Sequence, residues 1–200
     1  MTEINLLFSI DDRYVEQFKT TLYSVYLNSP SALLHLFVLQ KKLLKRNVEI
    51  EEFCEALGII YEPVVIGEKA FEDAPSTDRY PETIYYRLLA HEYLPKNLDR
   101  ILYLDADILC LNDICPLYKL EMGNALYAAA SHGSDANMTD LVNKMRLQNF
   151  EAESYYNSGV LLMNLTSIRK EVKREAILDY IAQNSFKPFL PDQDVLNALY

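Results

Sequence analysis

The sequence contains only five glycines, and no two of them lie within eight residues of each other. This spacing excludes the phosphate-binding loops Gly-x-Gly-x-x-Gly and the P-loop, because each needs at least two glycines in one short turn. It also excludes the Gly-x-Ser-x-Gly nucleophile elbow. The common glycine motifs for dinucleotide binding, for nucleoside triphosphate binding and for acyl transfer are therefore missing.

Basic residues are scarce: 19 Lys and Arg stand against 29 Asp and Glu, which gives a formal charge of -10. Nucleic acid is not an expected partner, because its binding depends on basic side chains that neutralise phosphates. An anionic small ligand would need a metal ion or a local basic group. A length of 200 residues with 50% hydrophobic and 24% charged residues fits one soluble globular domain and excludes disorder and collagen-like fibres.

Cysteines are few and odd in number, and Cys54, Cys110 and Cys115 include no Cys-x-x-Cys pair. This pattern argues against a disulfide framework and a zinc ribbon, and we expect reduced, mostly packed thiols. The first residues lack the basic region of a signal peptide, and the longest apolar runs are only as long as strands. These features predict a cytoplasmic protein without a transmembrane segment.

Short apolar runs alternate with helical patterns along the chain. Strands are expected at 4–10, 33–39, 59–66, 101–104, 125–130 and 159–164. Helices are expected around 18–26, at 43–57, 83–94, 139–148 and 167–183, and starting within 191–197, with a loop over 67–81. Parallel strands need crossover connections, which usually contain helices, so this alternation predicts an α/β fold with a mainly parallel sheet and helices on both faces.

The most informative polar feature is Asp105-Ala106-Asp107, which follows the expected strand at 101–104. Residues two apart on a strand project to the same side, so the two carboxylates would converge. A divalent cation would relieve their repulsion, and oxygen ligands of this kind suit Mg²⁺ or Mn²⁺, with ligand phosphates completing the shell. The alternative is a turn at the strand end with solvated aspartates, or a helix cap.

Other polar residues have both a functional and a structural interpretation. Asp11 and Asp12 follow the first strand, where open α/β sheets bind ligands, although Asp12 alone is typical of a helix cap. Arg87 lies within an expected helix, either on a solvated face or against a phosphate or carboxylate. Asn157-Ser158-Gly159 is typical of a turn that opens a strand, and Asp192 of a helix N-cap.

Taken together and in order, five blocks resemble the family 8 retaining glycosyltransferases, which include bacterial lipopolysaccharide galactosyl- and glucosyltransferases and glycogenin. The blocks are FSIDDRY at 8–14, YYRL at 85–88, LYLDAD at 102–107, YNSGVLLMN at 156–164 and DQDVLN at 192–197. The resemblance extends over nearly the whole chain. It implies a glycosyltransferase A-type (GT-A), Rossmann-like fold that binds a UDP-sugar with Mn²⁺ or Mg²⁺. It also implies transfer of a hexose from UDP-glucose or UDP-galactose to a saccharide or glycan acceptor, with retention of anomeric configuration.

The resemblance also implies roles for individual residues. Asp105 and Asp107 would hold the metal, and Arg87 would meet the diphosphate or the donor sugar. The catalytic set would be Gln193, Asp192 and Arg87, with Gln193 on the reacting face of the sugar. The nucleotide-sugar site would comprise Ser9, Asp11, Tyr14, Arg87, Asp105, Ala106, Asn157, Ser158, Asp192 and Gln193, of which Ser9, Asp11 and Tyr14 would line the uridine pocket.

This chemistry fits the residue types. Breaking a sugar–phosphate bond develops negative charge on the UDP leaving group and positive character on the sugar. A metal at the diphosphate, with carboxylates or carboxamides near the sugar, would stabilise both charges. A metal would also explain how an acidic protein binds an anion.

The sequence departs from the family pattern in two places. Arg13 occupies a position where other members often have Asn. The family's third metal ligand, a histidine in a His-x-x-Gly-x-x-Lys-Pro-Trp motif beyond the Asp-Gln-Asp block, is not among the 200 residues. We therefore expect residues 1–200 to form a single nucleotide-sugar-binding and catalytic domain that either lacks a C-terminal segment of the family or has a metal site open on one side.

Two other functions also fit parts of the sequence. A haloacid-dehalogenase-type phosphohydrolase also places Asp-x-Asp after an apolar strand, with the first Asp as nucleophile. Its motif normally lies near the amino terminus, whereas here the strand is the fourth. A nucleotide-sugar-binding module without catalysis is compatible with the missing histidine.

Overall fold

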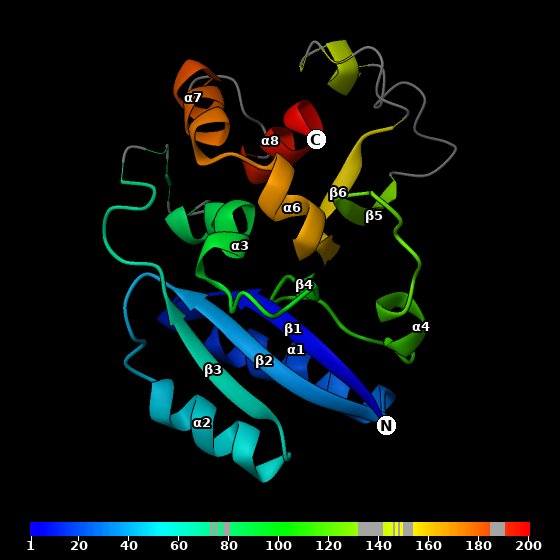
Figure 1. The fold of residues 1–200 in the computed structure, drawn as a ribbon. Helices are drawn as coiled ribbons and strands as arrows, with labels where there is room; N and C mark the ends of the chain where they lie inside the picture. The colour runs from blue at the N-terminus through cyan, green and yellow to red at the C-terminus, as the bar shows by residue number, and fades with distance from the viewer. Residues whose placement is uncertain are drawn as a thin grey trace.

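The described residues form a six-stranded sheet of order β3-β2-β1-β4-β6-β5 (Figure 1). The computed structural model describes residues 1–72, 74, 76–77, 81–131, 142–145, 147, 149, 154–184 and 191–200. The strands are β1 (Thr2–Ser9), β2 (Ala32–Gln40), β3 (Ile60–Val65), β4 (Arg100–Leu104), β5 (Tyr127–Ser131) and β6 (Tyr156–Asn164).

The first four strands of that order run parallel, and β6 runs antiparallel to both β4 and β5. The expected α/β class with a mainly parallel sheet is therefore confirmed. Because β6 is reversed, its first residues lie beside the carboxyl end of β4, where Leu104 pairs with Val160. This edge brings the end of β1, the end of β4 and the beginning of β6 together.

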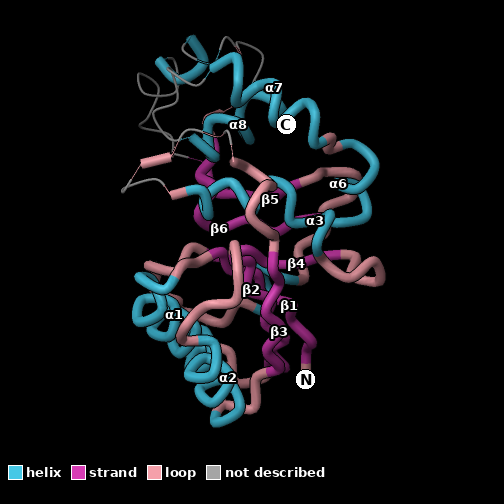
Figure 2. The backbone as a smooth tube through the Cα atoms, turned by 90° about the vertical axis from the view of Figure 1, so that its left-hand side faces the viewer, coloured by secondary structure: helices cyan, strands magenta, loops and turns pink. Residues whose placement is uncertain are grey.

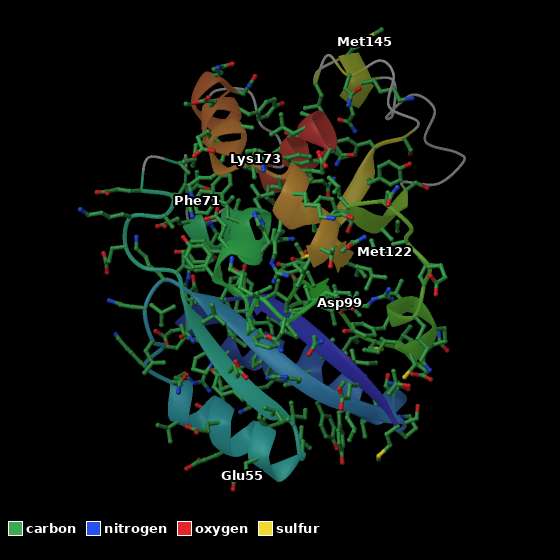
Figure 3. The ribbon with its side chains drawn as sticks, viewed as in Figure 1. Glu55, Phe71, Asp99, Met122, Met145 and Lys173 are labelled. Atoms are coloured by element: carbon green, nitrogen blue, oxygen red, sulfur yellow. The ribbon has the colours of Figure 1, made fainter. Side chains whose placement is uncertain are left out.

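Helices cover both faces of the sheet (Figure 2). One face packs against α1 (Val15–Asn28), α2 (Asn47–Ala56) and α4 (Cys115–Tyr118), with the short 3-10 turn η1 (Asp12–Tyr14) before α1. The other packs against the 3-10 helix η2 (Glu82–Leu89) and the α-helices α3 (Ala90–Tyr93), α6 (Leu165–Glu171), α7 (Arg174–Asn184) and α8 (Pro191–Leu199). Phe71, labelled in Figure 3, belongs to this second layer and stacks on Tyr85 with 5.6 Å between ring centroids.

Three helix predictions need correction. The helix expected at 43–57 begins only at Asn47. Before it the chain turns, and the side-chain oxygen of Gln40 accepts a hydrogen bond from the backbone N–H of Leu44 at 2.7 Å. The helix expected at 167–183 is two helices, since Val172 is extended and buries its side chain in the core on the face of the sheet that η2 and α8 cover. Helical spacing continued across that break, so the pattern alone did not reveal it.

The helix expected at 83–94 is mostly a 3-10 helix, which ends in one α-helical turn. Its residues 85–89 are all buried, so tertiary contacts on every side, rather than one amphipathic face, determine its geometry. Of the helix expected at 139–148, residues 142–145 and 147 are described and are helical, and the other half lies outside the described residues, as does part of the loop expected at 67–81. Within the described ranges, no helix is long and apolar enough to cross a membrane.

Candidate functional site

A cavity of about 330 Å³ lies at the edge where β1 and β4 end and β6 begins. Its walls also include η2 and the first turn of α8. All of the residues implied for the site line this cavity except Asp11. They are Ser9, Tyr14, Arg87, Asp105, Ala106, Asp107, Asn157, Ser158, Asp192 and Gln193.

The guanidinium of Arg87 is the centre of the buried side of the cavity. Its Nη2 lies 2.9 Å from Asp105 Oδ1, and its Nε lies 3.3 Å from Asp192 Oδ2. Nη1 donates to the backbone oxygen of Ser158 at 2.9 Å. A single arginine therefore joins β4, β6 and α8, and the solvated helix face considered for Arg87 is wrong, since only 6% of the residue is exposed.

The charge of Arg87 is stabilised by its surroundings. Burial by itself would lower the pKa of the guanidinium, but Asp192, Tyr103 and Asp105 outweigh burial and raise it. The guanidinium carbon also lies 4.2 Å from the centre of the Tyr103 ring, a favourable cation–π position. Arg87 is therefore a fixed positive charge in a site whose nearest ionisable partners are carboxylates.

Strand alternation places Tyr103 on the same side of β4 as Asp105. The Tyr103 hydroxyl donates to Asp105 Oδ1 at 2.8 Å. Burial raises the pKa of Tyr103 well above its usual value, and Asp105 raises it further, so the phenol keeps its proton and remains a donor. One carboxylate oxygen of Asp105 is thus held by Tyr103 and Arg87, whereas the described hydrogen bonds and ion pairs do not use Oδ2.

Ser158 connects β6 to the first turn of α8. Its backbone N–H donates to Gln193 Oε1 at 3.0 Å, and its hydroxyl donates to Asp192 Oδ2 at 2.9 Å. Gln193 is 5% exposed, and its Nε2 is buried without a hydrogen-bond partner among the described residues. Since an unsatisfied buried amide is unfavourable, this N–H group is suited to an oxygen of a bound ligand.

Two local assignments change with this geometry. Asn157, Ser158 and Gly159 lie within β6 rather than in a turn before it, because β6 pairs with β5 from Tyr156 onwards. Asp192 is the second residue of α8 rather than its N-cap, and its carboxylate faces Ser158 and Arg87. The residues interpreted as a turn and as a helix cap therefore line the cavity instead.

Gly159 allows Asp105 to lie close against β6. The backbone N–H of Asp105 donates to the oxygen of Gly159 at 2.8 Å. A β-carbon added at Gly159 would lie 2.6 Å from Asp105 Oδ2 and 3.0 Å from Asn157 Oδ1. A residue without a side chain is therefore needed here by close approach.

The opposite side of the cavity is more open. Asp107 is exposed and makes no ion pair or side-chain hydrogen bond with the described residues. The Ser9 hydroxyl donates to the backbone oxygen of Thr83 at 2.6 Å, which links β1 to η2. Asp11 caps η1 by accepting from the backbone N–H of Arg13 at 2.8 Å, and its carboxylate is paired with the Arg13 side chain outside the cavity.

The two aspartates fit a divalent cation. They line one cavity, and one of them, Asp105, keeps an oxygen free of the described contacts. Within the described ranges, no cluster of three or more His, Cys, Asp or Glu side chains could hold a metal ion. Two carboxylates with the remaining positions left to phosphate oxygens and water are a donor set typical of Mg²⁺ or Mn²⁺.

A second hollow of about 640 Å³ runs along β5 and the end of α8 and shares Asn157 and Ser158 with the cavity. Among the described residues, no acidic or basic side chain lines it. Although it is larger, its described lining offers no charged group for a metal ion or an anion, whereas the smaller cavity contains carboxylates and a guanidinium.

Sequence reasoning missed Tyr103 and Gly159 as site residues. Tyr103 could have been found, because it is two residues before Asp105 on a strand and so shares its side. Gly159 carried no comparable signal, since its role depends on the approach of β4 to β6.

Comparisons with known proteins identify the family of the chain. The profile of glycosyl transferase family 8 matches residues 5–200. The lipopolysaccharide 1,2-glucosyltransferase of Escherichia coli is 29% identical, over 98% of this chain and 58% of that protein. The lipopolysaccharide 1,3-galactosyltransferase of Salmonella typhimurium is 25% identical, over 98% of this chain and 59% of that protein. The chain thus spans somewhat more than half the length of these relatives.

Solved structures show the same fold. An active-site mutant of LgtC superimposes with a TM-score of 0.87 at 24% identity, covering 98% of this chain and 70% of that one. The galactosyltransferase LgtC in complex with donor and acceptor sugar analogues gives a TM-score of 0.84 over the same shares. The expected GT-A fold is confirmed, and the chain belongs to glycosyl transferase family 8.

Proposed function

We propose that this chain binds a UDP-sugar and a divalent cation in the 330 Å³ cavity and transfers the hexose to a saccharide or glycan acceptor with retention of configuration. The observation that carries the proposal is the meeting, in one cavity, of Asp105 and Asp107 with the buried contacts of Arg87, Asp192 and Gln193. Relatives named as lipopolysaccharide glucosyl- and galactosyltransferases support hexosyl transfer.

The nucleoside would lie against the β1 side of the cavity. Ser9 and Tyr14 line that side, and the Tyr14 ring offers a surface on which a base can stack. Ala106, between the two aspartates, is also part of the lining. Asp11 would act indirectly, by fixing the turn η1 from which Tyr14 projects.

The diphosphate would lie at Asp105 and Asp107. These carboxylates would hold Mn²⁺ or Mg²⁺, which, when bound, offsets the negative charge that develops on departing UDP. Arg87 fixes the orientation of Asp105 through the 2.9 Å ion pair. Its guanidinium has five N–H donors and lines the cavity, so an additional contact to the diphosphate or sugar is compatible with its protein contacts.

The hexose would lie beside Asn157, Asp192 and Gln193. Gln193 Nε2 would donate to an oxygen of the sugar or of the leaving group, while Ser158 holds the other end of the amide at 3.0 Å. Asp192 contributes negative charge next to a centre that becomes positive in the transition state. Its own position is fixed by Ser158 and Arg87.

Residues 1–200 would form the nucleotide-sugar-binding and catalytic domain, and a further metal ligand would come from a segment beyond those residues, as the length of the relatives suggests. The three cysteines are all free thiols, which fits a reducing compartment, and we propose a cytoplasmic location on that basis.

The direct test is incubation of the full-length protein with UDP-glucose or UDP-galactose, a glycan acceptor and Mn²⁺. We expect Mn²⁺-dependent release of UDP coupled to elongation of the acceptor. Binding of the UDP-sugar without release would favour a nucleotide-sugar-binding module. Release of phosphate from small phosphomonoesters without any need for UDP would favour a phosphohydrolase. Either result would refute the proposed transfer.

A further inference from the structure

Three polar side chains of α1 hold the segment that follows Asp105. The hydroxyl oxygen of Thr21 lies 2.8 Å from the backbone oxygen of Ala106 and 2.7 Å from that of Ile108. Farther along the segment, the backbone N–H of Cys110 donates to the hydroxyl of Ser24, and the side-chain amide of Asn28 donates to the backbone oxygen of Cys110, each at 2.9 Å.

Thr21, Ser24 and Asn28 lie at spacings of three and four residues, so they share one face of the helix. The rest of the buried face of α1 is mainly apolar and packs in the core beneath the sheet. A polar strip within such a face needs hydrogen-bond partners, and the backbone of residues 106–110 provides them. The strip therefore fixes this segment against the helix.

Thr21 differs from its neighbour Thr20. The exposed Thr20 hydroxyl donates to the backbone oxygen of Glu16, four residues earlier in the same helix, at 2.9 Å. Thr21 is only 1% exposed and directs its hydroxyl away from the helix, to two carbonyl oxygens of another segment. A hydroxyl has one hydrogen, so the two carbonyls share it as a three-centre bond.

The two carbonyls belong to the residues on either side of Asp107. Asp105 is oriented by side chains, namely Tyr103 and Arg87. The exposed side chain of Asp107 has no comparable support among the described residues. The direction of the Asp107 carboxylate therefore depends on the backbone before and after this residue. Thr21 contacts that backbone at both positions.

We propose that Thr21 is a positioning residue for Asp107: its buried hydroxyl holds the carbonyl groups before and after Asp107 and thereby directs that carboxylate toward a divalent cation in the cavity. The inference rests on the proposed function, in which Asp105 and Asp107 hold the cation. It adds a residue that lies outside the cavity and contacts neither cation nor substrate.

The test compares Thr21→Val with Thr21→Ser and with the matched control Thr20→Val. Valine keeps the shape of threonine but lacks the hydroxyl, whereas serine keeps the hydroxyl. Calorimetry would measure Mn²⁺ binding at saturating UDP, and UDP binding without metal. We expect Thr21→Val to weaken Mn²⁺ binding about tenfold or more, as is typical when a support of a metal ligand is lost. Metal-free UDP binding should not change, and Thr21→Ser and Thr20→Val should resemble the wild type.

Turnover gives a second readout. The Mn²⁺ concentration for half-maximal rate should rise in Thr21→Val, while kcat at saturating Mn²⁺ stays close to the wild-type value. If Thr21→Val does not fold, Thr21→Ala removes the same hydroxyl with less bulk and takes its place. Thermal melting of each variant identifies which variants are folded.

The outcomes separate this inference from the proposed function. Wild-type Mn²⁺ affinity in folded Thr21→Val or Thr21→Ala, together with its loss in Asp107→Ala, would overturn the role of Thr21 and leave the metal site intact. Equal loss of UDP binding with and without Mn²⁺ in the Thr21 variants would also overturn it, by showing general damage to the cavity. Unchanged Mn²⁺ affinity in Asp107→Ala would overturn the metal site itself, and the role of Thr21 with it.

Discussion

The two sides of the cavity are built in different ways. The buried wall, formed by Arg87, Tyr103, Asp105, Asp192 and Gln193, is held together by contacts between side chains of β4, η2 and α8 and by Ser158 of β6. The open wall, formed by Ser9, Tyr14 and Asp107, includes the exposed Asp107, whose position depends on backbone contacts. The buried wall is thus organised before any ligand arrives, whereas the open wall leaves oxygen atoms for a ligand to engage.

Substitutions in the two walls should therefore have different effects on the free energy of unfolding. The side chains of Arg87 and Asp192 are only 7% and 11% exposed, and such charges are stable only while each has its partner. A change in the buried wall should therefore affect both stability and binding. A change at the exposed Asp107 of the open wall should affect binding alone.

The largest effect is expected for Arg87→Ala, which leaves Asp105 and Asp192 without their common cation. Breaking a buried ion pair from one side typically costs about 3–5 kcal/mol, so the free energy of unfolding should fall by that order. Binding of a UDP-sugar should weaken by about 1.5–3 kcal/mol as well, the general scale of a charge-assisted hydrogen bond. Urea denaturation and calorimetry measure the two quantities.

Arg87→Lys is the matched control for this prediction. A lysine keeps the charge but cannot contact Asp105, Asp192 and the Ser158 carbonyl together with one planar group, so it should rescue only part of each loss. If Arg87→Ala kept wild-type stability and wild-type UDP-sugar turnover, the contacts of Arg87 would not be what holds the buried wall together.

A smaller effect on stability is expected for Gly159→Ala, which changes the contact between β6 and Asp105. The new methyl group would lie 2.6 Å from Asp105 Oδ2, so this carboxylate must shift from its position in the cavity that Asp107 also lines. We expect a stability loss of about 1–3 kcal/mol, as for other overpacked sites, together with loss of Mn²⁺-dependent UDP binding.

Gly58→Ala is the control, because Gly58 has a φ of +68°, an added β-carbon would meet no atom within 4 Å, and Gly58 does not line the cavity. It should lower stability through backbone strain and leave UDP binding unchanged. If Gly159→Ala bound UDP and Mn²⁺ like the wild type, close approach of β6 to Asp105 would not matter for the site.

The smallest effect on binding is expected for Asp11→Ala. Loss of the η1 cap should cost about 1 kcal/mol of stability, with little change in UDP affinity, because the Asp11 side chain is held by Arg13 outside the cavity. Calorimetry with UDP decides the matter. A large loss of UDP affinity at unchanged stability would instead place Asp11 in direct contact with the nucleoside and extend the open wall to include it.

The parts of the fold that depend on local pattern could be predicted from the sequence. Strand-sized apolar runs placed the six strands. The alternation argument for Asp105 and Asp107 does not apply, because β4 ends at Leu104 and the chain turns at 106 and 107, although both aspartates line the cavity. The break at Val172 could not be predicted, because helical spacing continues through it and only burial of that side chain turns the chain. Contacts between distant elements determine such details.

The same limit applies to the site. Nothing local to Arg87 distinguishes a buried arginine from a solvated one, since its ion-pair partners Asp105 and Asp192 lie 18 and 105 positions later in the chain. The resemblance to family 8 identified Arg87 where the residue pattern alone did not. Thr21 carried no signal at all, because its contacts with 106 and 108 appear only when α1 packs against the segment after β4.

The most direct test of the metal-dependent site is calorimetry of UDP binding, with and without Mn²⁺, in Asp107→Ala and in Asp179→Ala, an exposed aspartate on α7 outside the cavity. Wild type and Asp179→Ala should bind UDP more tightly when Mn²⁺ is present. Asp107→Ala should lose that gain, while its free energy of unfolding stays within about 0.5 kcal/mol of wild type, as for an exposed residue that makes no ion pair with the described residues. A Mn²⁺-dependent UDP affinity in Asp107→Ala equal to that of the wild type would contradict the account.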